Sequence, residues 1–373
     1  MKSAVTVIIV LMILGIVIFL LRQYSPSASN IISTSPSPAP NDQPDNVEAV
    51  KILATGLEVP WALAFLPNND LLITERRGTV KLLNADGKVI EVGKINGVKQ
   101  ITESGLHGVA VDPGFSTNQY VYFYYTYGEV GGNTANRVAR LQFDGQKLTN
   151  ETTIVDNIPG AQIHDGGRLK FGPDGHLYIT TGDAANPSLS QDKNSLAGKI
   201  LKVSDEGNVK MYSYGHRNPQ GIAWDRQGRL WETEHGQSAT DEVNLIEEGK
   251  NYGWPTTRGE QKQQGMQEPV LQSGSDTWAP AGATFYKGSV YFGGLKGQAL
   301  YQFNIDTLEL KEHFKRQFGR IRDVVLGPDN MLYITTSNRD GRGNPAPDDD
   351  KIIRINPRTM KLLVSPTFFL TYL

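Results

Sequence analysis

The feature that most constrains the fold of this chain is a pattern that recurs six times. Each copy has a short apolar run, a turn rich in Pro, Asn, Asp and Gly, and a second apolar run, as in residues 169–180 and 324–335. The copies start at residues 62, 108, 169, 221, 283 and 324, so their spacings are 46, 61, 52, 62 and 41 residues. Such a period predicts one supersecondary unit that stacks against its own copies.

Each copy is expected to form a β-hairpin, because turn residues separate two β-rich runs. A second hairpin fits the remaining length, as in residues 78–83 followed by Asp86 and Gly87. The 39 Gly and 20 Pro residues supply turns for many short strands. Four strands in ~50 residues, repeated six times, are typical of β-propeller blades. We therefore predict an all-β fold in which residues 47–358 form a six-bladed β-propeller, followed by a C-terminal tail at residues 359–373.

The N-terminal segment has a different character. Its residues 4–21 are almost entirely apolar, and a helix of that length would cover ~27 Å, close to the hydrocarbon thickness of a bilayer. We predict a transmembrane helix within residues 1–24; the alternative is a signal peptide cleaved near residues 27–29. Residues 25–46 are rich in Ser and Pro and are expected to form a disordered linker. The helix would anchor the propeller outside the cytoplasm, in the periplasm or the extracellular space, and cleavage would give a secreted form.

Composition excludes several classes of site. The chain contains no Cys, which excludes disulfide scaffolds, thiolate metal sites, iron–sulfur clusters and Cys nucleophiles. The 37 Lys and Arg residues against 39 Asp and Glu residues give a net charge of −2, and this balance does not indicate a nucleic-acid partner.

Polar clusters occupy two recurring positions of the repeat, directly before its first strand and directly after its second. Both positions lie at the same edge of a hairpin, so we expect the clusters to meet on one rim of the central channel. The clusters are at residues 162–168, 181–183, 215–221, 234–244 and 319–323.

These clusters carry motifs that resemble a known family. The motifs are His-x-Gly-Gly-Arg-Leu at 164–169, His-Arg-Asn-Pro-Gln-Gly at 216–221, Asp-Glu-Val-Asn-Leu-Ile at 241–246, Asn-Tyr-Gly-Trp-Pro at 251–255 and Arg-x-Arg-Asp at 320–323. In this order they resemble the soluble PQQ-dependent sugar dehydrogenases, the glucose/sorbosone dehydrogenase family, and particularly its aldose sugar dehydrogenase branch. The resemblance covers about residues 47–357. It implies a six-bladed propeller that holds pyrroloquinoline quinone (PQQ) and Ca²⁺ at the channel mouth and oxidises the C1 hydroxyl of an aldose to a lactone.

The resemblance also implies roles for individual residues. His164 matches the general base and Asp183 the acidic residue beside it. Arg217 and Asn218 match residues that contact the cofactor near its quinone oxygens, so Arg217 is also a catalytic candidate. The cations that match those holding PQQ are Lys296, Arg320 and Arg322, and the Ca²⁺ ligands are matched by the backbone carbonyls of Gly236 and Gln237.

Two further residues are candidates for the substrate side of this site. Glu103 stands where the glucose-specific branch carries Gln, and this difference leaves its role open. Trp278 is expected either to stack on a sugar or to pack in the core, and we favour the sugar.

Elementary chemistry agrees with this set of residues. PQQ carries three carboxylates and needs compensating cations, and Arg binds carboxylates through two parallel hydrogen bonds. Ca²⁺ prefers oxygen ligands and would polarise a quinone carbonyl. Removal of the hydroxyl proton requires a base that works near neutral pH, and a His next to a carboxylate suits that task.

Two other functions compete with this reading. One is a Ca²⁺-dependent propeller lactonase-type hydrolase, which needs carboxylates and Asn side chains on its metal. The other is a non-catalytic propeller that binds glycans or protein partners. For a dehydrogenase, electrons would pass to an external acceptor, a quinone or a redox protein, because the chain has no Cys for haem attachment.

Overall fold

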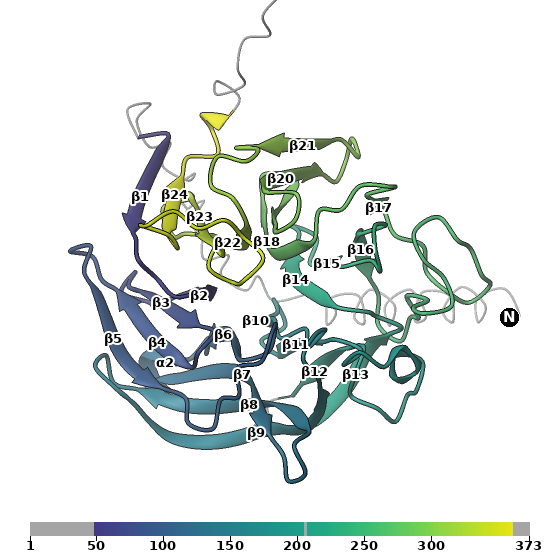
Figure 1. The fold of residues 1–373 in the computed structure, drawn as a ribbon, viewed down its shortest axis with the longest axis horizontal. Helices are drawn as coiled ribbons and strands as arrows, with labels where there is room; N and C mark the ends of the chain where they lie inside the picture. Colours follow the sequence, from purple (N-terminus) through teal and green to yellow (C-terminus); the bar gives the residue numbers. More distant parts are fainter. Residues whose placement is uncertain (1–47, 205–206, 361–373) are drawn as a thin grey trace, which may run out of the picture. The chain divides into compact units, whose positions relative to one another are not determined.

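The computed structural model describes residues 48–204 and 207–360. Within them lie six antiparallel sheets of four strands each, arranged around a common axis (Figure 1). Five sheets are formed by consecutive strands, so each follows directly from one copy of the repeat. The predicted all-β, six-bladed propeller is confirmed.

The blades follow one another along the chain, and we number them from the first complete sheet. Blade 1 has β2 (Pro60–Phe65), β3 (Leu71–Glu75), β4 (Thr79–Leu83) and β5 (Val89–Lys94); blade 2 has β6 (Leu106–Val111), β7 (Tyr120–Gly128), β8 (Thr134–Phe143) and β9 (Leu148–Gly160); blade 3 has β10 (Leu169–Phe171), β11 (Leu177–Thr181), β12 (Lys199–Val203) and β13 (Val209–Tyr214). Blade 4 has β14 (Pro219–Trp224), β15 (Leu230–Glu234), β16 (Glu242–Ile246) and β17 (Leu271–Gln272); blade 5 has β18 (Pro280–Tyr286), β19 (Ser289–Gly294), β20 (Ala299–Asn304) and β21 (Leu310–His313). Blade 6 has β22 (Ile321–Leu326), β23 (Leu332–Thr336), β24 (Ile352–Ile355) and β1 (Val50–Ala54). The short helices are α2 (Phe115–Asn118) and η1 (Pro187–Ser190).

The ring is closed by a strand from the other end of the chain. β1 pairs antiparallel with β24, with Val50 opposite Ile355 and Ile52 opposite Ile353. Blade 6 therefore joins the first described strand to the last one (Figure 1). This closure links residues that are about as far apart in sequence as the propeller allows.

Neighbouring blades pack face to face through apolar side chains. Between blades 1 and 2, Leu72 and Val80 pack with Val121, Phe123 and Leu141 in one buried cluster. Every residue of β3 is buried, because this strand has a blade on each side. Such strands appear in the sequence as continuous apolar runs instead of a regular alternation.

The N-terminal predictions fall outside the described residues. The structure does not describe the residues of three predicted segments: the transmembrane helix within residues 1–24, the linker at 25–46 and most of the tail at 359–373. Among residues 48–204 and 207–360, no helix has the length and apolar character needed to cross a bilayer.

Candidate active site

The polar clusters meet at one mouth of the propeller, as the repeat predicts. A cavity of about 420 Å³ lies there, a volume within the usual range for small-molecule sites. Its walls come from loops of different blades. The lining residues include Glu103 before β6, Asp165 before β10, His235 after β15, Lys296 after β19, Arg320 before β22 and Arg342 after β23.

His164 is held at this mouth in a fixed orientation. Its Nδ1 lies 2.8 Å from Asp183 Oδ1, and Asp183 is fully buried. The other oxygen of that carboxylate accepts a hydrogen bond of 2.8 Å from the indole of Trp254. A carboxylate between such donors can only accept, so His164 donates from Nδ1 and its Nε2 keeps a lone pair.

The backbone around His164 has an unusual conformation. His164 has a φ of 62°, in the left-handed region that a residue with a Cβ rarely adopts. Gly182 passes close beneath it, and a Cβ at Gly182 would lie 2.0 Å from the His164 carbonyl oxygen. Glu103 Oε2 accepts the backbone N–H of His164 at 3.2 Å. These contacts explain why a Gly stands directly before Asp183.

Arg217 completes the surroundings of the imidazole. Its Nη2 lies 2.9 Å from His164 Nε2, and its Nη1 donates to the His235 carbonyl at 3.3 Å. Guanidinium is only a donor, so this contact also leaves His164 Nε2 as the acceptor. Burial lowers the pKa of Arg217, although nearby carboxylates, Asp183 first among them, oppose that shift. The structure thus brings together all three residues predicted to be catalytic.

The predicted cations Arg320 and Arg322 face the same carboxylate. Arg320 donates to Asp340 Oδ2 from Nε at 2.9 Å and from Nη2 at 2.8 Å, and Arg322 Nη2 lies 4.0 Å from that oxygen. Arg322 also donates to Gln220 Oε1 at 2.8 Å. Burial lowers the pKa of Arg322 to about 9, against the opposing charge of Asp340. Lys296 is exposed and lines the cavity.

This mouth contains buried donors that have no acceptor within the described part of the chain. A buried donor without a partner costs free energy, so a group of them indicates a ligand rich in acceptors. The atoms are Arg76 Nε, Arg217 Nε, Asn218 Nδ2 and Arg322 Nε. Asn218 Oδ1, by contrast, accepts the N–H of Gly166 at 3.1 Å. An anionic cofactor with several carboxylate and carbonyl oxygens fits this donor set.

Glu103 forms an ion pair with Arg342 at the wall of the cavity. Burial alone would raise the pKa of Glu103, but the hydrogen bond and charge of Arg342 outweigh it and hold the pKa at about 2. The carboxylate is therefore ionised at neutral pH, with one oxygen on Arg342 and the other on the backbone of His164.

Gly236 and Gln237 lie beside a second, much smaller space of about 10 Å³, which Arg217, Glu234 and Glu242 also line. The Gly236 N–H donates to Asp241 Oδ1 at 2.8 Å. The guanidinium groups of Arg217 and Arg258 line this space together with the two carboxylates. The roles predicted for these two carbonyls, like those of the other site residues, stay predictions.

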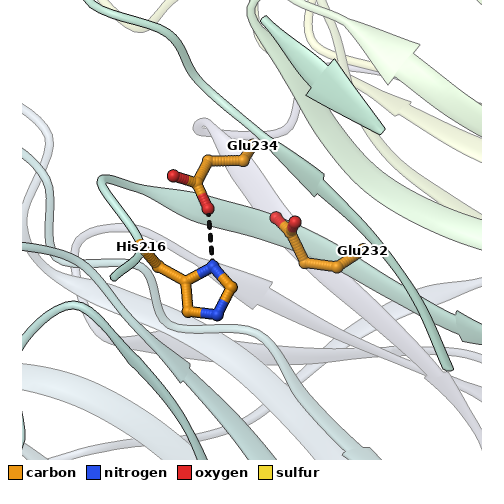
Figure 2. A group of neighbouring side chains, drawn as sticks. All are labelled: His216, Glu232 and Glu234. Atoms are coloured by element: carbon orange, nitrogen blue, oxygen red, sulfur yellow. Dashed lines mark hydrogen bonds and ion pairs between the residues drawn. The ribbon is translucent and has the colours of Figure 1, made fainter. Parts of the chain in front are cut away.

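A buried group of His216, Glu232 and Glu234 lies next to that space (Figure 2). Each residue offers one ligand atom, and these atoms lie within 4.8 Å of one another. His216 Nδ1 contacts Glu234 Oε2 at 2.8 Å, and its Nε2 contacts Ser213 Oγ at 2.8 Å. Burial, followed by the charge of Glu234, raises the pKa of Glu232 well above its ordinary value. Because both ring nitrogens of His216 already have protein partners, these contacts need no metal ion to explain them.

Trp278 does not support the expected contact with a sugar. Its side chain is 7 % exposed and belongs to the apolar cluster between blades 4 and 5. Its ring lies 5.6 Å from that of Tyr301 and 5.8 Å from that of Phe292. The indole therefore packs in the core, and a contact of Trp278 with the sugar stays a prediction.

Asp340, Arg342 and Trp254 were missed as site residues in the sequence. Asp340 and Arg342 follow β23, the second strand of the last repeat, which is the same position that Asp183 occupies in the third. The positional rule for polar clusters, applied to the last repeat, would have found both. Trp254 lies within the Asn-Tyr-Gly-Trp-Pro motif at 251–255, but only the fold shows that its indole reaches Asp183.

Comparisons with known proteins agree with the motifs. A family model described as glucose / sorbosone dehydrogenase matches residues 57–354. The chain is 31% identical to aldose sugar dehydrogenase YliI of Escherichia coli, over 83% of this chain and 93% of that protein. It is 34% identical to the uncharacterized protein slr1608 of Synechocystis, over 81% of this chain and 86% of the relative.

A solved structure gives the same result at the level of the fold. The PQQ-bound form of aldose sugar dehydrogenase from Streptomyces coelicolor superposes with a TM-score of 0.78 at 38% identity, and the match covers 82% of this chain and 97% of that one. The family model spans nearly the whole propeller, and the ordered motifs at its mouth lie within that span. This chain therefore belongs to the glucose/sorbosone dehydrogenase family of oxidoreductases.

Proposed function

We propose that this protein is a PQQ-dependent dehydrogenase that oxidises the C1 hydroxyl of aldose sugars to lactones, with His164 as the general base. The observation that carries the proposal is the imidazole held between Asp183 and Arg217, next to the lining residues Glu103 and Asp165 of a cavity whose walls carry several cations. The names of the related enzymes, an aldose sugar dehydrogenase and a PQQ-bound dehydrogenase, support the same substrate and cofactor.

The donor set at the mouth suits PQQ. Lys296, Arg320 and Arg322 would hold its carboxylates, and Arg217 and Asn218 have free buried donors for its carbonyl oxygens. The Gly236 and Gln237 carbonyls would hold Ca²⁺ next to it. Bound PQQ supplies the two-electron acceptor that takes the hydride from C1.

The residues of the chain itself manage the proton. His164 Nε2 takes the proton of the C1 hydroxyl, because Nδ1 is committed to Asp183; the hydroxyl then replaces Arg217 Nη2 as the partner of Nε2. The buried carboxylate of Asp183 then stabilises the imidazolium and preserves its orientation, as Trp254 holds the second carboxylate oxygen in place. Glu103 and Arg342, an acceptor and a donor on the cavity wall, would contact sugar hydroxyls.

We further propose that the propeller works outside the cytoplasm, anchored through the apolar segment at residues 4–21, and that it passes electrons to an external quinone or redox protein. The support is the length of this segment and the lack of Cys for an attached haem.

Reconstitution tests the proposal. Purified protein is mixed with PQQ and Ca²⁺, and reduction of a redox dye is followed with D-glucose and other aldoses. We expect sugar-dependent dye reduction only when PQQ is present. Folded protein that reduces no dye with any aldose would overturn the proposal, and lactone hydrolysis without PQQ would favour the hydrolase instead. The cavity walls argue against the hydrolase, because Lys296, Arg320, Arg322 and Arg342 outnumber the carboxylates Glu103 and Asp165.

A further inference from the structure

Glu234 at the end of β15 binds two donors that are neighbours in sequence. Its Oε2 lies 2.8 Å from His216 Nδ1, and its Oε1 accepts the backbone N–H of Arg217 at 2.5 Å. Figure 2 shows the carboxylate directed at the imidazole of His216. The Glu234 residue is 4 % exposed, so both hydrogen bonds are shielded from water.

Ser213, His216 and Glu234 form a chain of contacts in the order used by hydrolytic triads. Ser213 Oγ lies 2.8 Å from His216 Nε2, and the imidazole continues to Glu234. However, Ser213 and His216 are both 0 % exposed, and the His216 ring stacks on Tyr252 with centroids 4.9 Å apart. No acyl substrate can reach this serine. These three side chains therefore stabilise the backbone and do not catalyse acyl transfer. His216 donates from Nδ1 to Glu234, and its Nε2 accepts from Ser213.

The backbone that Glu234 holds is that of Arg217. Glu234 takes the N–H of Arg217, and the backbone N–H of Asp183 donates to the Arg217 carbonyl at 2.8 Å. The side chains of the same two residues, Asp183 and Arg217, then contact opposite nitrogens of His164. These contacts connect the backbone and the side chain of Arg217 to His164. A shift of the Arg217 backbone would therefore move its guanidinium relative to the imidazole of His164.

We infer that Glu234 is a positioning residue that acts through Arg217: by holding the peptide between His216 and Arg217, it fixes the Arg217 guanidinium against His164 Nε2 and toward the cofactor. This inference rests on the proposed dehydrogenase function. Glu234 does not line the cavity at the mouth; it lines the smaller space beside Gly236 and Gln237 and reaches His164 through Arg217.

The geometry makes substitutions of Glu234 informative. Glu234→Gln keeps the length, and its two contacts can be preserved if the amide oxygen faces Arg217 and His216 switches to the other tautomer, with Nε2 donating to Ser213. Glu234→Asp keeps the charge but is one methylene shorter, so it cannot reach both donors. A positioning role therefore predicts that Gln is tolerated better than Asp, whereas a purely electrostatic role predicts the reverse.

Glu232 provides the matched control. It lies two residues earlier on the same strand, is fully buried, and contacts Asn244 at 3.1 Å instead of the Arg217 backbone. Glu232→Asp and Glu232→Gln therefore make the same chemical changes at a neighbouring buried carboxylate, and they leave the hydrogen bond to the Arg217 backbone in place.

The first measurement needs neither cofactor nor turnover. In protein labelled with ¹⁵N-histidine, the Nε2 resonance of His164, assigned by its loss in His164→Gln, reports the contact with Arg217. We expect this resonance to move in Glu234→Asp and to stay in place in both Glu232 variants. An unmoved resonance in folded Glu234→Asp would overturn the inference. If Glu234→Asp fails to fold, Glu234→Gln decides: an unchanged Nε2 resonance together with a shifted His216 tautomer signal supports the inference, and an unchanged His216 signal contradicts it.

The second measurement uses the reconstituted enzyme. We expect Glu234→Asp to lower kcat by more than about tenfold, since small misplacements of a catalytic group have effects of this size or larger. PQQ binding to Glu234→Asp, measured by titrating the apoprotein with PQQ, should weaken. In Glu234→Gln and both Glu232 variants, kcat and the PQQ affinity should stay within about threefold of the parent protein. A larger loss in Glu234→Gln than in Glu234→Asp would overturn the inference. A parent protein without sugar-dependent activity contradicts the proposed function alone, because the resonance of His164 still tests the positioning.

Discussion

His164 is the residue on which the proposed chemistry depends, and its two ring nitrogens have different neighbours. A fully buried carboxylate fixes Nδ1, and a guanidinium faces Nε2. The left-handed backbone of His164 is maintained by its N–H contact with Glu103 and by the close approach of Gly182. The motif around His164 predicted it as the base, but the Arg217 contact depends on the packing of blade 3 against blade 4 and could not be predicted from either motif.

Asp183→Asn should abolish most of the activity of the reconstituted protein. The Asp183 carboxylate accepts hydrogen bonds from His164, Trp254 and the backbone of Ala185, and an Asn side chain has only one oxygen for these donors. We expect kcat/KM to fall by roughly 10²-fold or more, the usual contribution of general-base catalysis. Steady-state kinetics with Asp306→Asn, an exposed Asp, as the control checks this. Unchanged kcat/KM in a folded Asp183→Asn protein would rule out the pairing as a catalytic feature.

Glu103 predicts a specific pH dependence of stability. Its pKa is about 2 in the folded protein, below the ordinary 4.5, so its ionised form is favoured by folding. The corresponding stability is present above pH 4.5 and is lost as the pH falls from there toward 2. We expect the Tm difference between the parent protein and Glu103→Gln to be largest at pH 7 and to shrink at pH 3. A Tm difference that stays constant across this range would contradict the ion pair with Arg342.

At the scale of the strands, the hairpins could be predicted because their turns carry Pro, Asn, Asp and Gly at recurring positions. The pairing of β1 with β24 could not be predicted, because β1 precedes the first repeat and its partner lies about three hundred residues away in the chain. The burial of Glu232 and Glu234 on β15 was also hidden. A central strand normally excludes charges, and only the fold shows that His216, Arg217 and Asn244 surround these two carboxylates.

The two isoleucines that face each other across β1 and β24 provide a matched stability test. Ile353 is fully buried in the apolar cluster between blades 5 and 6, whereas its register partner Ile52 is 48 % exposed. We expect Ile353→Ala to lower the free energy of unfolding by about 2–5 kcal/mol, as is usual for a buried aliphatic side chain. Ile52→Ala should cost less than about 1 kcal/mol, since exposed positions contribute little. Urea unfolding compares the two, and equal losses would contradict the packing described here.

At the scale of the whole molecule, the propeller assembles one site from residues that lie far apart in sequence. The ion pair between Glu103 and Arg342 joins the loop before blade 2 to the loop after β23 of blade 6. The sequence predicted that polar clusters would share a rim, because their position in the repeat is constant. It could not predict which loops touch, since that depends on the stacking of the blades around the axis.

The anchor proposed for the N-terminal segment is tested on the full chain. If residues 4–21 form an uncleaved transmembrane helix, the expressed protein should remain in the membrane pellet after an alkaline carbonate wash and dissolve in detergent. N-terminal sequencing of the same material should then begin at or next to Met1. A mature protein that begins near residue 30 and is recovered without detergent would show that the segment is a cleaved signal peptide.

The central claim is that an aldose loses a hydride from C1 while His164 takes the hydroxyl proton. Single-turnover reduction of the PQQ-reconstituted protein, followed by stopped-flow absorbance, tests this most directly when glucose and glucose deuterated at C1 are compared. The account predicts that reduction is slower with the deuterated sugar and that His164→Gln protein binds PQQ but reduces it at least about 10²-fold more slowly. Equal rates for the two sugars, or an unimpaired rate in His164→Gln, would contradict it.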